Sequence, residues 1–159
     1  MAETLDPTDW LILLELQRDG RVPLTELARR VSLGASATTE RVKRLEAAGV
    51  ITGYRATVDL DRVGYPVLAV VRLKHAGSRH EPFHRLLDDR AEVLECLRTT
   101  GDDCYVLKVA ATSMEHLEHV VNALSFFGDT NTNIVYSQTL PFRGPANPDA
   151  SVLPDVARR

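Results

Sequence analysis

Hydrophobic residues between positions 24 and 51 recur at helical spacing in two consecutive runs. The first run contains Leu24, Leu27, Ala28 and Val31, and the second contains Thr38, Val42, Leu45 and Ala48. Residues 32–35 separate the runs, and Gly34 is in position to cap the second helix. Gly49 follows the second run, where a left-handed residue commonly ends a helix. The pattern therefore predicts two helices joined by a four-residue turn, each with one buried face.

The outward face of the second predicted helix begins with small polar residues and continues with cations. Its members, with the flanking arginines, are Ser36, Thr39, Glu40, Arg41, Lys43 and Arg44. Small residues let a helix approach base edges in a major groove, and long cations reach the phosphates on either side. We therefore predict base contacts from Ser36, Thr39 and Glu40, and phosphate contacts from Arg41, Lys43 and Arg44. The alternative is an ordinary amphipathic helix pair with a solvated basic face.

A further helix precedes this pair, and a short strand is expected to follow it. Asp6 suits the N-cap position of the first helix, Pro7 its first turn and Asp9 the positive end of its dipole. Residues 18–20 are expected to end it. After Gly49, the apolar residues of positions 51–58 change to the spacing of a strand that leaves the three-helix unit.

Charge, glycine and proline gather at positions 59–66 and mark a domain boundary. We expect a DNA-binding domain over residues 1–58, a linker over 59–65, a second domain over 66–142 and a proline-containing tail over 143–159. In the second domain, strands are expected at 67–73, 93–99, 105–111 and 133–140, with helices at 81–87 and 114–127. This order predicts an α+β fold, whose ferredoxin-like βαββαβ domain has four strands and two helices on one face.

Such a sheet leaves its other face without a cover inside one chain. Pairing with a second copy is the simplest way to bury it. We therefore expect a homodimer through the open face, where Leu68, Val70, Val106 or their alternating neighbours lie.

Composition restricts the function further. The net charge is −3, so any surface that binds nucleic acid has to be local. Residues 41–55 are such a segment, because they contain four cations and only one glutamate. No long apolar run or signal pattern is present, and two cysteines without Cys-x-x-Cys spacing suit reduced thiols, so we expect a cytoplasmic protein. The pairs His80 and His84, and His116 and His119, lack further ligands, so no metal site is expected. Neither a nucleophile–base set nor a phosphate-binding glycine loop is visible, and we expect no enzyme and no cofactor.

Several motifs resemble the Lrp/AsnC (leucine-responsive and asparagine regulator) family of transcription regulators. The first is the spacing Leu5-Asp6-x-x-Asp9-x-x-Ile12-Leu13-x-x-Leu16, followed by Glu26-Leu27-Ala28. The next is Arg41-Val42-Lys43-Arg44-Leu45-Glu46-x-x-Gly49-Val50-Ile51-x-Gly53-Tyr54, and the last is Thr100 to Val109. The resemblance covers residues 5–141. It implies a winged helix-turn-helix, a dimer built through the βαββαβ sheets, often an assembly of four dimers, and binding of a small molecule, usually an amino acid, near the turn after the second sheet strand.

The chain departs from the family pattern at three places. Ser32 and Gly34 stand where the family usually has Gly and Ser, which weakens the helix cap by a few tenths of a kcal/mol at most. Pro23 replaces the usual Ser or Thr before the second helix. The common Pro-Gly-Val before the last strand is absent, and Phe127 to Asn133 stand there. Because this change lies where the ligand is expected, the identity of the ligand cannot be transferred.

An effector site is nevertheless expected at two loops. Gly101, Asp102 and Asp103 form a turn whose carboxylates can receive an α-ammonium group, and a loop at Thr130, Asn131 and Thr132 can fix the carboxylate. The alternative for the turn is a plain hairpin connection. Two alternative functions also stay open, an enzyme of the related sirohaem decarboxylase type and an amino-acid sensor without DNA binding.

Overall fold

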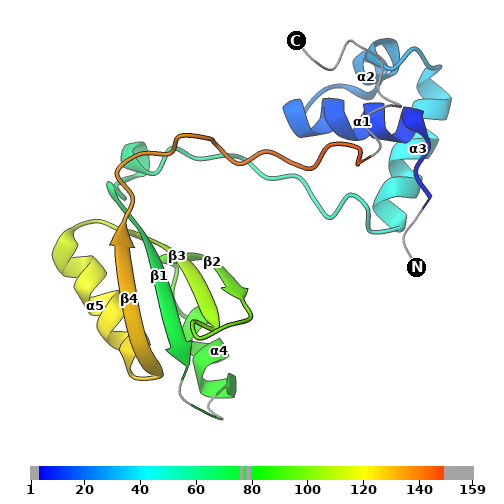
Figure 1. Ribbon diagram of the computed structural model, residues 1–159. Helices are drawn as coiled ribbons and strands as arrows, with labels where there is room; N and C mark the ends of the chain where they lie inside the picture. Colours follow the sequence, from blue (N-terminus) through cyan, green and yellow to red (C-terminus); the bar gives the residue numbers. More distant parts are fainter. Residues whose placement is uncertain (1–3, 76, 78–79, 149–159) are drawn as a thin grey trace. The chain divides into compact units, whose positions relative to one another are not determined.

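The computed structural model describes residues 4–75, 77 and 80–148 (Figure 1). The chain divides into two compact units. The first unit contains the chain up to Ala56 together with the segment that starts at Pro141, and the second contains Thr57–Leu140. Each unit has its own hydrophobic core, so each is described by itself.

The first unit begins with α1, Pro7–Arg18, whose start is the predicted one. The Asp6 carboxylate accepts from the backbone N–H of Asp9 at 2.8 Å, and the Asp9 carboxylate accepts from that of Asp6 at 3.1 Å. This reciprocal capping box satisfies two backbone donors that the helix itself leaves unpaired. Asp6 is therefore confirmed as the N-cap of α1.

Helices α2, Leu24–Arg30, and α3, Ala35–Ala47, form the predicted pair. Gly34 caps α3, and Gly49 has a φ of 69°, the left-handed conformation expected after this helix. The core contains Ile12, Leu27, Val42 and Leu45, each at most 5% exposed. Two expected core positions are wrong: Leu24 is 39% exposed and Ala48 is exposed. Both lie at helix ends, where helical spacing no longer fixes which side faces the core.

The strand expected at 51–58 is also wrong. Residues 52–59 contain neither helix nor strand, and the first unit has no strand among its described residues. Tyr54 is instead held by its hydroxyl, which donates to the Glu46 carboxylate at 2.9 Å. A strand needs a partner for its backbone groups, and apolar spacing alone does not supply one. A 3-10 turn, Asp61–Val63, then leads into the sheet.

The second unit is the predicted βαββαβ domain. Its strands are β1, Val67–His75, β2, Val93–Arg98, β3, Tyr105–Ala111, and β4, Gly128–Ile134. They form one antiparallel sheet in the order β2-β3-β1-β4. Helices α4, His80–Asp88, and α5, Met114–Ser125, cover one face of it (Figure 1). The α+β prediction for the chain is thus confirmed.

Alternation along the strands separates the two sheet faces. Ala69, Val71 and Leu73 of β1 are fully buried under the helices, in a core with Phe83 of α4 and Leu124 of α5. Each buried Val, Leu or Phe side chain of this core contributes about 1.5–3 kcal/mol. The alternate residues of β1, including Arg72 and Lys74, lie on the open face.

The last strand was predicted about five residues too late. It begins at Gly128, separated from the end of α5 by two residues, and pairs with β1 from His75 opposite Gly128 to Ala69 opposite Ile134. Because β4 is an edge strand with one open face, its sequence is mostly polar, and this polarity resembles a loop. Thr130, Asn131 and Thr132 are therefore strand residues, and the loop predicted there is wrong.

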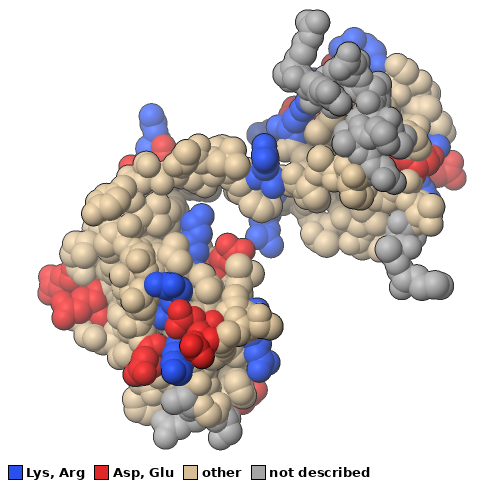
Figure 2. All heavy atoms as spheres, viewed as in Figure 1, with Lys and Arg blue, Asp and Glu red and all other residues tan. Residues whose placement is uncertain are grey.

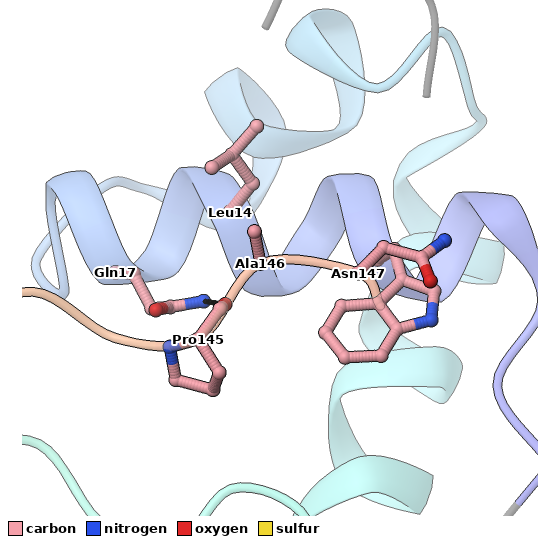
Figure 3. Close-up of a pocket in the computed structure, with 6 residues that line it drawn as sticks. Leu14, Gln17, Pro145, Ala146 and Asn147 are labelled. Carbon is pink, nitrogen blue, oxygen red and sulfur yellow. Dashed lines mark hydrogen bonds between the residues drawn. The ribbon is translucent and has the colours of Figure 1, made fainter. Parts of the chain in front are cut away.

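After β4, the chain returns to the first unit and lies along α1 (Figure 3). The Gln17 amide donates to the Pro145 carbonyl at 3.2 Å, and Trp10 and Leu14 line the same small depression as Ala146 and Asn147. A Cβ added to Gly144 would collide with the Gln17 side chain. The segment from Pro141 to Pro148, which contains the whole described part of the predicted tail, is thus part of the first unit.

Candidate nucleic-acid interface and effector site

The outward face of α3 presents the residues predicted to contact bases. Ser36 and Glu40 are exposed, and Thr39 is half-buried. The Thr39 hydroxyl donates to the Ala35 carbonyl at 2.8 Å, one turn earlier in the helix. Its oxygen can still accept, so Thr39 can receive a hydrogen bond from a base donor but has already used its own proton.

The three predicted phosphate contacts differ in their surroundings. Lys43 is exposed, and no ion pair in the described parts of the chain involves it. Arg41 Nη1 lies 2.6 Å from Asp6 Oδ2 and 2.8 Å from Asp9 Oδ1. Arg44 Nη2 lies 2.7 Å from both oxygens of Asp9. The two arginines thus hold α3 against the start of α1.

Sequence reasoning assigned Asp6 and Asp9 to helix capping and missed their pairing with the arginines. Partial burial raises the pKa of Asp6. The hydrogen bonds from the Asp9 backbone N–H and the Arg41 guanidinium together lower it by more, so the pKa lies below its usual value. The same carboxylates raise the pKa of Arg41. Asp6, Ala37, Glu40, Arg41 and Arg44 together line an open depression of about 460 Å³ beside α3.

The charge distribution supports a local interface. Figure 2 shows acidic and basic side chains intermixed on the face that it presents, without a broad region of one sign. On α3, Arg41 and Arg44 lie beside the acidic partners Asp6 and Asp9, while Lys43 is exposed. A surface of this kind favours contacts at defined positions over a general attraction to nucleic acid.

Asp103 and Asn131, both predicted effector residues, meet at Arg72 on the open sheet face. Arg72 Nη2 donates to Asn131 Oδ1 at 3.0 Å, and its Nε lies 3.7 Å from Asp103 Oδ2. Asn131 Oδ1 also accepts from Asn133 Nδ2 at 2.8 Å. Sequence reasoning missed Arg72, although a single arginine within the apolar run Val67 to Leu73 was a usable signal.

The other predicted effector residues are placed differently. Gly101 and Asp102 are exposed in the β2–β3 connection next to Asp103, where the Thr99 N–H donates to the Cys104 carbonyl at 2.9 Å and closes the hairpin. Thr130 and Thr132 pair with the buried positions Leu73 and Val71, so they share the helix-covered face. They are therefore not on the surface that carries Arg72, Asp103 and Asn131.

One histidine of each pair noted in the sequence has a hydrogen-bond partner in the protein. His116 Nε2 lies 2.9 Å from Glu92 Oε1, and His80 Nδ1 lies 3.3 Å from the Tyr105 hydroxyl. Across the described residues, no three histidine, cysteine or acidic side chains are grouped as metal ligands. Within the same residues, no helix has the length and apolar character needed to cross a membrane.

Two family models match the chain. One, described as winged helix-turn-helix DNA-binding, matches residues 5–52, and the other, described as Lrp/AsnC ligand binding domain, matches residues 68–145. The chain is 34% identical over 134 residues to the HTH-type transcriptional regulator LrpC of Bacillus subtilis. The alignment covers 84% of this chain and 93% of LrpC.

Two similar solved structures contain an amino acid. The feast or famine regulatory protein of Mycobacterium tuberculosis complexed with L-methionine has a TM-score of 0.84 and 31% identity, covering 91% of this chain and 100% of that one. A transcriptional regulator of Neisseria meningitidis in complex with L-methionine has a TM-score of 0.83 and 31% identity, covering 94% and 100%. The matched relatives are transcriptional regulators and not enzymes, which leaves the decarboxylase alternative without support.

Proposed function

Because the chain belongs to the Lrp/AsnC family and is a DNA-binding transcriptional regulator with a ligand-binding domain, we propose that α3 reads double-stranded DNA and that Arg72 and its neighbours bind an amino-acid effector. On α3, Ser36, Thr39 and Glu40 face bases, while Arg41, Lys43 and Arg44 face phosphates. Lys43 is the strongest phosphate contact because its ammonium is exposed at the helix surface.

The observation that carries the effector proposal is the position of Arg72 between Asp103 and Asn131. A guanidinium binds a carboxylate through two parallel hydrogen bonds, and a carboxylate binds an ammonium group. The 3.7 Å separation of Arg72 Nε and Asp103 Oδ2 is longer than a direct hydrogen bond, so each group can turn towards a ligand without breaking a tight pair. An α-amino acid carries an ammonium group and a carboxylate on the same carbon atom, and Gly101 and Asp102 complete the rim of the site.

The open sheet face is proposed as the dimer interface. Leu97 of β2 is 52% exposed and pairs across the sheet with Val106 of β3, while Leu68 and Val70 continue the face on β1. Burying these side chains against a second copy removes an apolar surface from water. We also propose that the dimers assemble further. The protein is proposed to act in the cytoplasm, where it can bind DNA.

Binding of L-methionine, the amino acid named in the two related complexes, tests the effector site. Titration calorimetry should show binding by the wild type and a loss of about 10- to 100-fold in Arg72→Gln and in Asp103→Asn, since each removes a charged hydrogen-bond partner. Lys74→Gln, which changes an exposed cation of the same strand, is the matched control. If methionine does not bind to the wild type, the same titrations are made with a pool of the other amino acids. Equal affinities in all four proteins would refute the assignment.

A further inference from the structure

Two carboxylates at the start of α1 contact α3, but they differ in their access to water. The Asp9 side chain is 1% exposed and the Asp6 side chain 44% exposed. Asp9 receives hydrogen bonds from Arg41, Arg44 and the Asp6 backbone. Asp6 accepts from the Asp9 backbone through Oδ1, while its Oδ2 faces Arg41 Nη1 at 2.6 Å.

The contact between Asp6 and Arg41 lies at the surface predicted to meet DNA. The Arg41 side chain is 30% exposed, and both residues line the depression shared with Ala37 and Glu40 of α3. A carboxylate and a phosphate bind a guanidinium with the same fork geometry, because each offers two oxygens in one plane. Asp6 Oδ2 thus occupies a donor of Arg41 that a phosphate oxygen would otherwise use.

We infer that Asp6 acts as an intramolecular substitute for a DNA phosphate and thereby limits the affinity of the protein for DNA. In the free protein it neutralises Arg41, and on DNA the backbone phosphate takes its place. This inference goes beyond the assignment of Arg41 as a phosphate contact, because it names the acidic residue that opposes the contact. It rests on the proposed role of Arg41.

The surroundings of the two carboxylates explain why only Asp6 exchanges. A solvated ion pair is weak, since water competes for both partners, and it can be replaced by another anion at little cost. A buried carboxylate that loses its cation stays in a medium that does not solvate it. Asp9 therefore keeps its hydrogen bonds with Arg44 and Arg41 during binding, and only the contact between Asp6 and Arg41 is exchanged.

Asparagine at position 6 separates the charge from the capping role. Asn is as good an N-cap as Asp, so Asp6→Asn keeps the start of α1 while removing the negative charge. Binding to a fluorescent duplex of mixed sequence is measured by anisotropy between about 50 and 200 mM salt. We expect roughly 3- to 10-fold tighter binding by Asp6→Asn at the low-salt end, because Arg41 is freed from its ion pair with Asp6 and can bind a phosphate. The salt dependence should become steeper by up to ~0.9, as for one further phosphate contact.

Two further variants make the test specific. Asp19→Asn removes one negative charge at the other end of α1, next to its last residue Arg18, and should bind like the wild type. In an Arg41→Gln background, Asp6→Asn should give no gain, because the released partner is absent. A gain that persists in that background, or that Asp19→Asn reproduces, would assign the effect to net charge and overturn the inference. Unchanged affinity of Asp6→Asn, with α1 intact by circular dichroism, would overturn it as well.

If Arg41→Gln alone binds DNA like the wild type, the proposed phosphate contact of Arg41 fails, and the inference fails with it. If Arg41→Gln weakens binding while Asp6→Asn changes nothing, only the inference about Asp6 is refuted. The two results therefore distinguish a failure of the proposed phosphate contact of Arg41 from a failure of the inference that Asp6 opposes this contact.

Discussion

Arg44 of α3 donates to both carboxylate oxygens of Asp9 at 2.7 Å, and the Asp9 side chain is buried. Asp9 belongs to α1, so this pair joins the first helix of the unit to the helix proposed to read DNA. Removing the Asp9 carboxylate leaves Arg44 without this partner. The Arg44 side chain is 44% exposed, so water still solvates its charge, and this limits the loss of stability.

We therefore expect Asp9→Ala to lower the free energy of unfolding of the first unit by about 2–3 kcal/mol, through the lost ion pair and the lost capping box. Urea unfolding followed by fluorescence reports on this unit, because Trp10, the one tryptophan of the sequence, belongs to α1. Asp19→Ala, at an exposed position after α1, should cost less than about 0.5 kcal/mol. Equal stabilities of the two variants would mean that the pair contributes nothing.

Lys43 and Thr39 should affect DNA binding in different ways. Lys43→Ala should weaken binding to every duplex and reduce the salt slope by ~0.9, because one phosphate contact is lost. Thr39→Ala should leave the slope unchanged and alter the preferred sequence, since it removes an acceptor on the base-facing side. Selection of binding sites from genomic fragments, repeated at two salt concentrations, measures both. An unchanged slope in Lys43→Ala would show that its ammonium does not contact a phosphate.

Replacing an apolar residue on the open sheet face should dissociate the dimer. Leu97→Asp places a charge on a side chain that is 52% exposed in the single chain, so the fold should tolerate it while the interface does not. Light scattering at micromolar concentration should show a dimer or larger assembly for the wild type and a monomer for the variant. Met114→Glu, at an exposed position of the first turn of α5, is the control. A wild-type monomer would contradict the proposed interface.

Acid should destabilise the second unit partly through Glu92. A backbone hydrogen bond within Glu92 and the hydrogen bond with His116 hold the pKa of its carboxyl below the usual 4.5. The folded state therefore binds this proton less readily than the unfolded state, so the stabilising contribution is complete above pH 4.5 and is lost as the pH falls through the lower folded-state value. Thermal unfolding followed by circular dichroism between pH 7 and about pH 3 should fall less steeply in Glu92→Gln. Parallel profiles would contradict the role of this pair.

The contact between the C-terminal segment and α1 predicts a change in proteolysis. Gly144→Val should displace the Gln17 side chain and break its hydrogen bond to Pro145, at a cost below about 1 kcal/mol. Trypsin should then cleave after Arg143 faster than in the wild type, while cleavage after Arg62, which is exposed before β1, stays unchanged. Gln17→Ala should have the same effect. If both sites are cut at wild-type rates, the segment gains no protection from α1.

The helices could be predicted from the sequence because their signals are local. The Asp6 cap, the helical spacing of Leu27, Val42 and Leu45, and the left-handed Gly49 each involve residues close in the chain. Three strands could also be predicted, since alternation marks strands that pack on helices. The family motifs then supplied DNA binding and a ligand-binding domain, both of which the comparisons confirm.

Only the tertiary structure decided which distant residues meet. The start of β4 follows from its pairing with β1, because an edge strand of Thr and Asn has no apolar pattern of its own. Asp9 and Arg44 are 35 positions apart, and Arg72 and Asn131 are 59 apart. Capping and helical spacing describe neighbours along the chain, whereas an ion pair depends on how helices and strands pack. The sequence therefore determined the fold class and the family, and packing decided that Asp6 and Asp9 pair with arginines of α3 and that Arg72 joins two of the predicted effector residues.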